Sequence, residues 1–256
     1  MKLTIIGCAG SFANAESAGS CYLLEHDGYS LLLDLGSGAL GSLARYLSVA
    51  DVNAVALSHV HLDHCADLGG LYVSRRYDPR GIASKIPVFG PPGVAARMDQ
   101  MYGLNSGDDD DEDDETTMQS VFDFVEYDGI AHTVGPFTIE AVPVVHCLPA
   151  FALRVSAGGR VLIYSGDTGF CQSLIDASVG AHVALYEASF VESADNPADV
   201  HLTGAEGGRA ATEAGVDRLI VTHLVAWNDD DEVLADARST YRGDLMKARP
   251  GLSITV

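Results

Sequence analysis

Apolar and polar positions follow one another along this chain in short blocks. Twelve apolar blocks are rich in Val, Ile, Leu, Phe and Tyr and are bounded by Gly, Pro, Asn, Asp or Ser, a pattern typical of β-strands. The strands expected on this basis cover residues 3–6, 21–24, 30–33, 54–57, 87–89, 121–127, 137–145, 151–155, 161–164, 183–186, 219–222 and 252–256.

Helical spacing of apolar positions occurs between some of these blocks. One such stretch begins with Thr203 and Glu206 in the spacing of a capping box and ends before Gly215, so both of its ends are well marked. Strand-rich halves that are each followed by helices predict two packed sheets with helices on the outer faces. The helices are expected over residues 40–47, 68–75, 93–101, 173–177, 203–214 and 230–241.

The composition indicates a single domain, and the net charge disfavours large anionic partners. With 256 residues, 47% of them hydrophobic, and no Pro/Gly/Ser-rich linker, the chain is expected to form one domain over residues 1–256. The formal net charge of −21 disfavours nucleic acid and anionic membranes as large partners. The acidic run 108–115 is expected to be a solvated or disordered loop.

Five cysteines without a C-x-x-C pair argue against a disulfide framework and for a reducing compartment. No apolar run approaches the length of a transmembrane helix. We therefore expect a cytoplasmic protein without a membrane partner.

Residues 59–64, His-Val-His-Leu-Asp-His, carry four metal-binding side chains directly after an expected strand. In an extended segment His59 and His61 point the same way, whereas Asp63 and His64 come from the next turn, so this segment can serve two neighbouring metals. Imidazole and carboxylate ligands suit zinc, with manganese or iron as alternatives. The simpler reading, a histidine-rich loop without a ligand role, is disfavoured by the strand context.

Three further candidate ligands lie at the ends of expected strands. They are His146 after 137–145, Asp167 in Ser-Gly-Asp-Thr, and His223 in Thr-His-Leu. Each alone could equally be a hydrogen-bonded structural residue. Together with the first cluster they complete two coordination spheres and a bridge.

These motifs resemble the metallo-β-lactamase superfamily, and more narrowly the branch that holds ribonuclease Z and related phosphodiesterases. The resemblance spans nearly the whole chain and implies an α/β fold, an αββα sandwich of two mixed β-sheets flanked by helices. No cysteine takes a ligand position, which speaks against a lactamase. By this resemblance one metal is held by His59, His61 and His146, the other by Asp63, His64 and His223, and Asp167 bridges the two.

Two more residues match the ribonuclease Z branch, Glu187 in Glu-Ala-Ser and His201 in His-Leu-Thr-Gly, and the resemblance implies that this pair protonates the leaving oxygen. Two divalent ions about 4 Å apart lower the pKa of a shared water from ~15.7 to about 7 and clamp a phosphoryl oxygen. A leaving alkoxide needs a proton, which an imidazole oriented by a carboxylate can supply. We thus expect Asp63, Glu187 and His201 to act in catalysis; the alternative for His201 is a bond to the backbone at the helix entry.

The chain departs from ribonuclease Z where that family carries a long arm that grips transfer RNA. Only 21 positions separate His146 from Asp167, so there is no room for the arm. What remains resembles the compact actinobacterial atypical class II cyclic-nucleotide phosphodiesterases. Arg75 and Arg76 could neutralise a substrate phosphate or serve as a helix end. Asp34, in Asp-Leu-Gly-Ser-Gly, is expected to be structural because its carboxylate can bond turn amides.

The function expected from these features is hydrolysis of a small cyclic nucleotide, with 3′,5′-cyclic AMP as the best single guess and 5′-AMP as product. The protein would use two divalent ions, zinc first and manganese or iron as alternatives, and form a homodimer. Two alternatives stay open. One is ribonuclease Z-like processing of transfer RNA 3′ ends or cleavage of other cyclic phosphodiesters, and the other is a metal-bound binding module without catalysis.

Overall fold

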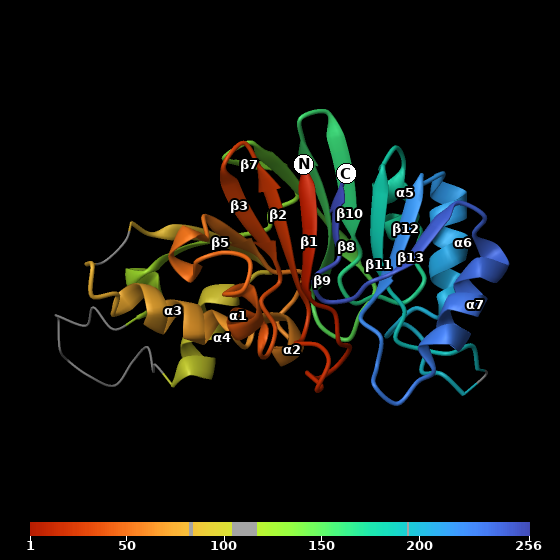
Figure 1. The fold of residues 1–256 in the computed structure, drawn as a ribbon, viewed down its shortest axis with the longest axis horizontal. Helices are drawn as coiled ribbons and strands as arrows, with labels where there is room; N and C mark the ends of the chain where they lie inside the picture. The colour runs from red at the N-terminus through yellow and green to blue at the C-terminus, as the bar shows by residue number, and fades with distance from the viewer. Residues whose placement is uncertain (82–83, 104–116, 194) are drawn as a thin grey trace.

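The twelve expected strands and two others form two seven-stranded mixed sheets that pack face to face, with helices on both outer faces (Figure 1). The computed structural model describes residues 1–81, 84–103, 117–193 and 195–256, so the acidic run 108–115 lies outside the described residues. In spatial order the first sheet contains β14 (Ser253–Thr255), β1 (Lys2–Gly7), β2 (Cys21–His26), β3 (Tyr29–Leu33), β4 (Ala54–Ala56), β5 (Ile86–Gly90) and β6 (Phe122–Glu126).

The second sheet is parallel from β13 to β10 and antiparallel from β10 to β7. All twelve expected strands are present, each within a few residues of its expected bounds. The two strands that the pattern missed are β7 and β13, whose sequences, His-Thr-Val and Asp-Leu-Met-Lys, contain too few apolar residues to form a clear strand pattern. In spatial order the strands are β13 (Asp244–Lys247), β12 (Arg218–Thr222), β11 (Val183–Glu187), β10 (Arg160–Tyr164), β9 (Ala150–Ala157), β8 (Phe137–Val144) and β7 (His132–Val134).

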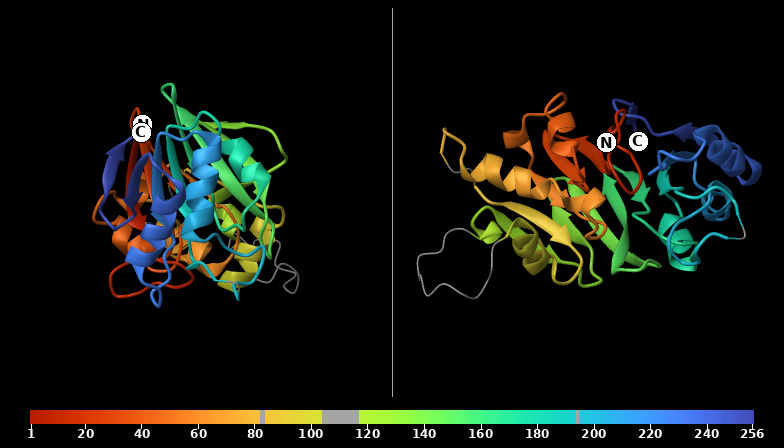
Figure 2. Two further views of the ribbon diagram at one scale, coloured as in Figure 1. Left: turned by 90° about the vertical axis from the view of Figure 1, so that its right-hand side faces the viewer. Right: turned by 90° about the horizontal axis from the view of Figure 1, so that it is seen from below.

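The helices cover the outer faces of the sheets (Figures 1 and 2). On the first sheet lie α1 (Ala39–Leu43), α2 (Leu62–Cys65), α3 (Leu68–Arg76) and α4 (Val94–Tyr102), and on the second lie α5 (Gln172–Ser178), α6 (Gly204–Ala214) and α7 (Asp230–Thr240). Among the described residues, 3₁₀ turns occur at η1 (Val49–Asp51) and η2 (Met118–Ser120). The capping box of Thr203 and Glu206 and the left-handed Gly215 are confirmed at the two ends of α6. No helix in the described ranges is both long and apolar enough to cross a membrane.

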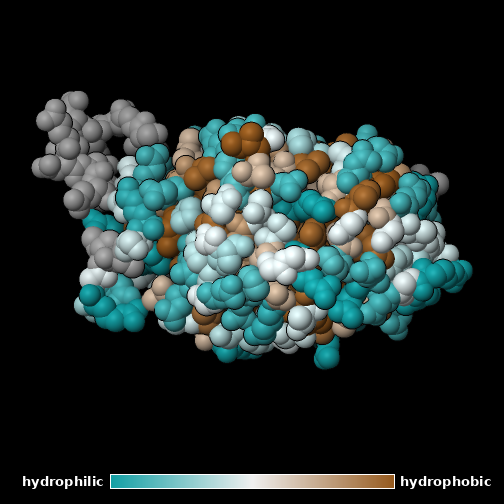
Figure 3. Space-filling model, turned by 90° about the horizontal axis from the view of Figure 1, so that it is seen from above, coloured by the Kyte–Doolittle hydropathy of each residue, from teal (hydrophilic) through white to brown (hydrophobic). Residues whose placement is uncertain are grey.

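Strands that are apolar on both faces explain the layered architecture. In β3, Leu31 and Leu33 point into the core between the sheets, whereas Leu32 points into the core beneath α1 to α4. In β10, Tyr164 joins the central core and Ile163 the core beneath α5 to α7. On the face over the two chain termini, hydrophilic residues predominate and hydrophobic ones are scattered (Figure 3).

The loop that follows β3 fixes the position of α2, which lies at the lower edge of the sandwich in Figure 1. The amide of Leu35 donates to the carbonyl of His64 (2.8 Å), and the amide of Ser20 donates to the carbonyl of Asp63 (2.9 Å). Gly36 allows this close approach, because a Cβ there would lie 1.8 Å from the Asp63 carbonyl oxygen. Asp63 and His64 are therefore held by the backbone of a different segment.

We predict opposite effects for two glycine-to-alanine substitutions in this region. Gly36→Ala must displace the Asp63 carbonyl and should lower the free energy of unfolding by about 1–3 kcal/mol. Gly41→Ala is the matched control, because a Cβ there meets nothing within 4 Å, and in helix α1 it should raise stability by about 0.5–1 kcal/mol. Urea unfolding of both variants measures the difference, and equal stabilities would contradict this explanation of the packing.

Candidate metal centre

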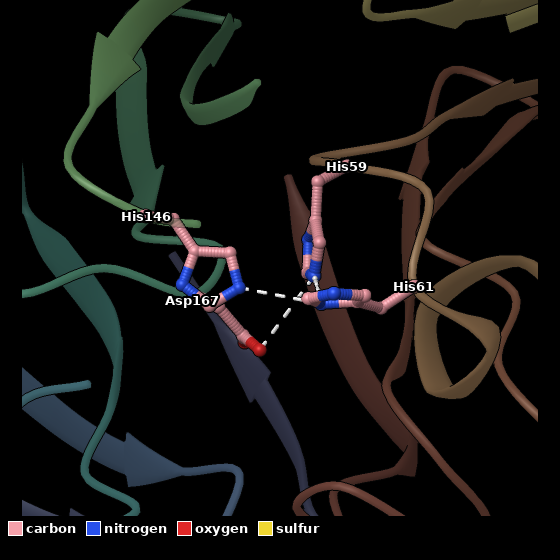
Figure 4. A group of neighbouring side chains, drawn as sticks. All are labelled: His59, His61, His146 and Asp167. Carbon is pink, nitrogen blue, oxygen red and sulfur yellow. Dashed lines mark hydrogen bonds and ion pairs between the residues drawn. The ribbon is translucent and has the colours of Figure 1, made fainter. Parts of the chain in front are cut away.

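All seven metal-ligand candidates lie together at the edge where the two sheets meet. His59, His61, Asp63 and His64 follow β4 in the first sheet. His146 follows β8, Asp167 follows β10 and His223 follows β12 in the second. Figure 4 shows His59 and His61 approaching from one side and His146 and Asp167 from the other. Residues 164 positions apart in sequence thus converge on one site.

The first group consists of His59, His61, His146 and Asp167, whose candidate ligand atoms lie within 4.8 Å of one another. The Nδ1 atom of His61 is 3.0 Å from Nε2 of His59 and 3.3 Å from Nε2 of His146. The Oδ2 atom of Asp167 is 3.6 Å from Nε2 of His59. Three ring nitrogens and one carboxylate oxygen therefore face a common point.

The second group consists of Asp63, His64, Asp167 and His223, all of them buried. The two Nε2 atoms of His64 and His223 are 3.1 Å apart, and Asp63 Oδ2 is 3.1 Å from Nε2 of His223. The Oδ1 atom of Asp167 lies 3.2 Å from Nε2 of His64. Asp167 thus presents one oxygen to each group, which is the arrangement a bridging carboxylate needs.

Hydrogen bonds on the outer side of three rings determine where their ring protons lie. Nδ1 of His146 is 2.8 Å from the Val200 carbonyl, which can only accept, so this nitrogen carries the proton. Nδ1 of His223 is 2.8 Å from the Ser189 hydroxyl, which gives its own proton to the His223 carbonyl and therefore accepts from the ring. Nδ1 of His64 donates in the same way to the Asp34 carboxylate (2.7 Å). The Nε2 lone pairs of these rings all point inward.

Asp34 also orients a fourth ring. The Ser58 hydroxyl donates to Asp34 Oδ2 (2.8 Å) and therefore accepts from Nδ1 of His59, which is 3.0 Å away. The same carboxylate accepts from the Ser58 amide (2.6 Å) and from the Tyr164 hydroxyl (2.7 Å). Asp34 is fully buried and is not a member of either candidate ligand group, as expected, but it bonds side chains and one amide of neighbouring segments rather than its own turn.

A cation between these groups would stabilise the converging lone pairs. His64 and His223 bring two Nε2 atoms to 3.1 Å although both ring protons are already used outside, and the buried Oδ1 of Asp167 accepts no hydrogen bond from any described residue. Burial lowers the pKa of His59, which favours the neutral ring that a metal ligand must have. Burial also lowers the pKa of His64, but Asp167 and Asp34 outweigh it and raise the pKa, so these two carboxylates stabilise positive charge at this position. The nitrogen and oxygen donors fit zinc, manganese or iron.

Glu187 and His201 lie next to these groups. Nδ1 of His201 is 2.9 Å from Glu187 Oε1, and the His201 ring centroid lies 5.5 Å from that of His146 and 5.6 Å from that of His223. Burial lowers the pKa of His201, but the charge and hydrogen bond of Glu187 outweigh it and raise the pKa to about 9. Glu187 is fully buried and fixed by three backbone amides, those of Thr168, Ser189 and Leu202.

The two arginines considered for a phosphate contact lie in α3, outside the candidate ligand groups. Arg75 is buried in α3 and donates to the Ser84 carbonyl (2.6 Å), so the structure favours a structural role over a phosphate contact. Arg76 lies 6.0 Å from the centre of the Tyr77 ring. The sequence reasoning missed Ser58 and Ser189, which hold the outer nitrogens of two rings. Their positions offered a signal, because Ser58 precedes His59 and Ser189 lies two residues after Glu187.

The comparisons with known proteins agree with this geometry. A family model described as the anti-Pycsar protein Apyc1 matches residues 1–204. Protein Rv1339 of Mycobacterium tuberculosis is 37% identical over 249 residues, which cover 95% of this chain and 88% of that protein. Ribonuclease Z of Mycolicibacterium gilvum is 28% identical over 266 residues, covering 93% and 91%.

A solved structure extends the comparison to three dimensions. The metallo-β-lactamase fold protein YhfI from Bacillus subtilis, also named as a probable metallo-hydrolase, superimposes with a TM-score of 0.86 at 30% identity over 99% of this chain and 98% of that one. The αββα fold expected from the motifs is confirmed, and so is the resemblance to the branch that contains ribonuclease Z.

We predict that Asp34→Asn weakens metal binding by about 10- to 100-fold, the usual effect of losing an outer partner of a ligating histidine. Asparagine tolerates the positive φ of 57° at this position, so backbone strain does not explain a loss. Asp99→Asn is the matched control, since Asp99 is a buried aspartate that accepts from the Met118 amide. Competition with a chromogenic chelator measures the affinity. Wild-type affinity in Asp34→Asn would show that Asp34 does not orient the rings.

Proposed function

We propose that this chain, which belongs to the family of the anti-Pycsar protein Apyc1, uses two divalent ions to hydrolyse the phosphodiester of a small cyclic nucleotide. It is a metal-dependent hydrolase of the branch that also contains ribonuclease Z. Our first choice of substrate is 3′,5′-cyclic AMP, with 5′-AMP as the product. The observation that carries the proposal is the Glu187–His201 pair beside two groups of converging ligands.

We assign one metal to His59, His61 and His146, the second to Asp63, His64 and His223, and the bridge to Asp167. Zinc is the first choice for both, with manganese or iron as alternatives. When bound, such a pair of ions lowers the pKa of a shared water and stabilises the charge that develops on the phosphoryl oxygens. The inward lone pairs described above support this assignment.

His201 has the position of a proton donor to the leaving oxygen. Its Nδ1 is engaged by Glu187, which leaves Nε2 to face the reacting group. Hydrolysis to 5′-AMP adds water to phosphorus and breaks the bond to O3′, so O3′ leaves as an alkoxide and needs a proton. The negative charge of Glu187 keeps the His201 ring protonated until that step. Glu187 is a positioning residue, because it acts through His201.

The charge of the chain supports a small substrate. A formal net charge of −21 opposes a long polyanion but costs less for a mononucleotide with a single phosphodiester charge that the metal ions neutralise. The segment between His146 and Asp167 leaves no room for the arm that grips transfer RNA. We further propose a single catalytic domain, because the ligands come from both sheets. The homodimer and the cytoplasmic location stay predictions, to be tested by sedimentation and by cell fractionation.

The central test is hydrolysis of 3′,5′-cyclic AMP by the metal-loaded protein, with chromatography of the product. We expect 5′-AMP, no turnover in Asp63→Ala, and a kcat about 10²- to 10⁴-fold lower in His201→Ala. His26→Ala is the control. His26 is the last residue of β2 and belongs to none of the candidate ligand groups, so the substitution should leave kcat unchanged.

A second substrate separates proton donation from other roles of His201. The p-nitrophenolate of bis(p-nitrophenyl) phosphate leaves without a proton, so His201→Ala should reduce its hydrolysis far less than that of cyclic AMP. Equal losses on both substrates would contradict proton donation. Cleavage of a transfer RNA 3′ trailer without cyclic AMP turnover would favour the ribonuclease Z-like alternative. No turnover of any of these substrates would favour the binding module.

A further inference from the structure

Two exposed aromatic side chains lie beside the candidate metal centre and have no part in the chemistry described so far. Trp227 is 72% exposed and Phe12 is 43% exposed, yet their rings contact each other, with centroids 5.3 Å apart and planes tilted by 38°. Exposed aromatic side chains that contact each other form a contiguous apolar surface, which is typical of a binding site. We propose that Phe12 and Trp227 form a stacking platform for the nucleobase of the substrate.

Backbone contacts place the segment before Phe12 next to His223. The amide of Gly10 donates to the carbonyl of Leu224 (3.0 Å), and Gly10 is packed so closely that a Cβ would lie 2.4 Å from the His223 carbonyl oxygen. The Ser11 amide donates to Nε2 of His223 (3.4 Å). Phe12, the next residue, therefore lies beside the second metal group.

Trp227 is held from the opposite side. The side-chain amide of Asn228 donates to the carbonyl of Ser189 (2.7 Å), and the backbone amide of Asn228 donates to the carbonyl of Val225 (3.0 Å). Trp227 therefore lies in a turn that these hydrogen bonds close. Ser189 is the residue whose hydroxyl orients the His223 ring. The backbone of Trp227 is consequently positioned relative to a metal-ligand candidate, and its indole contacts the Phe12 ring.

Other ligand segments also carry exposed apolar side chains. Leu62, between His61 and Asp63, is 54% exposed, and Val145 and Leu148 flank the His146 segment and are 39% and 37% exposed. A cyclic nucleotide has one charged part, the phosphodiester, and one flat, neutral part, the base. The metal groups suit the first part, and an aromatic surface at their edge suits the second.

This inference rests on the proposed function, because it assigns the base of that substrate to a surface. The alternative occupant of such a patch is a second copy of the chain. The platform adjoins the segment that carries His223, so it lies within reach of the base of a nucleotide whose phosphodiester is held at the metal groups, and a second copy seated there would compete with that base. The nucleobase is therefore the occupant that the observations favour.

Trp227 is the single tryptophan of the chain, so its fluorescence reports on the platform directly, without any turnover. The metal-loaded protein would be titrated with the slowly hydrolysed phosphorothioate of 3′,5′-cyclic AMP and with base-free ribose 3′,5′-cyclic phosphate. We expect the nucleotide to quench and shift the tryptophan emission and the base-free compound to leave it unchanged at saturation. Calorimetry measures binding of both compounds independently of the fluorescence.

Matched variants test the energy of stacking. Trp227→Ala should weaken binding of the nucleotide by about 5- to 150-fold, whereas Trp227→Phe should retain most of the affinity and neither should change the affinity for the base-free compound. Tyr77→Ala is the control, because Tyr77 is similarly exposed (66%) but directly follows α3, away from the ligand segments.

The outcomes separate this inference from the proposed function. Turnover of cyclic AMP with unchanged fluorescence and full affinity in Trp227→Ala would overturn the platform and leave the function standing. Quenching without turnover would support the platform and count against the function. Fluorescence that changes with protein concentration alone, together with a dimer that Trp227→Ala dissociates, would overturn the platform by showing that a second copy covers it.

Discussion

The buried carboxylate of Asp34 is the interaction on which the rest of the centre depends. One of its oxygens accepts from Ser58, His64 and Tyr164 at 2.7–2.8 Å, and these donors come from three different segments. The bonds to His64 and Ser58 send the ring protons of His64 and His59 outward, so the lone pairs point inward. The bond from Tyr164 joins the second sheet to the first at the same place. Asp34 adopts a positive φ of 57° at this position, a strained conformation for a residue other than glycine.

The centre is assembled from both sheets, so its geometry depends on how the sheets pack. Tyr22 of the first sheet and Tyr164 of the second lie with ring centroids 4.9 Å apart in the central core, and the Tyr22 hydroxyl bonds that of Thr222, which precedes His223. This packing sets the distance between the segment that carries His64 and the strand ends that carry Asp167 and His223. Because a close-packed core transmits small displacements, substitutions in the core beneath the site should disturb the ligands before they unfold the chain.

Much of this was predictable from the sequence, and the reason differs from element to element. The twelve strands with a strong apolar pattern and the capping box of α6 were expected, because burial and capping leave local signals. The strands β7 and β13 were not, since segments of three and four residues with one or two apolar side chains leave no clear pattern. The four-residue helix α2 was read only as a turn because its bounds depend on hydrogen bonds to the β3 loop. The ligand candidates followed from motif spacing, whereas the roles of Ser58, Ser189 and the exposed pair Phe12 and Trp227 depend on contacts between segments that no local pattern encodes.

The central claim is that two ions share the bridge of Asp167, and the metal content of the purified protein tests it most directly. Elemental analysis should find two equivalents of zinc, manganese or iron per chain. In a variant that lacks His59 and His61 it should find about one equivalent, because the second group retains Asp63, His64 and His223. A wild-type protein that binds one equivalent or none, after incubation with these metals and removal of the excess, would contradict the dinuclear centre and the mechanism built on it.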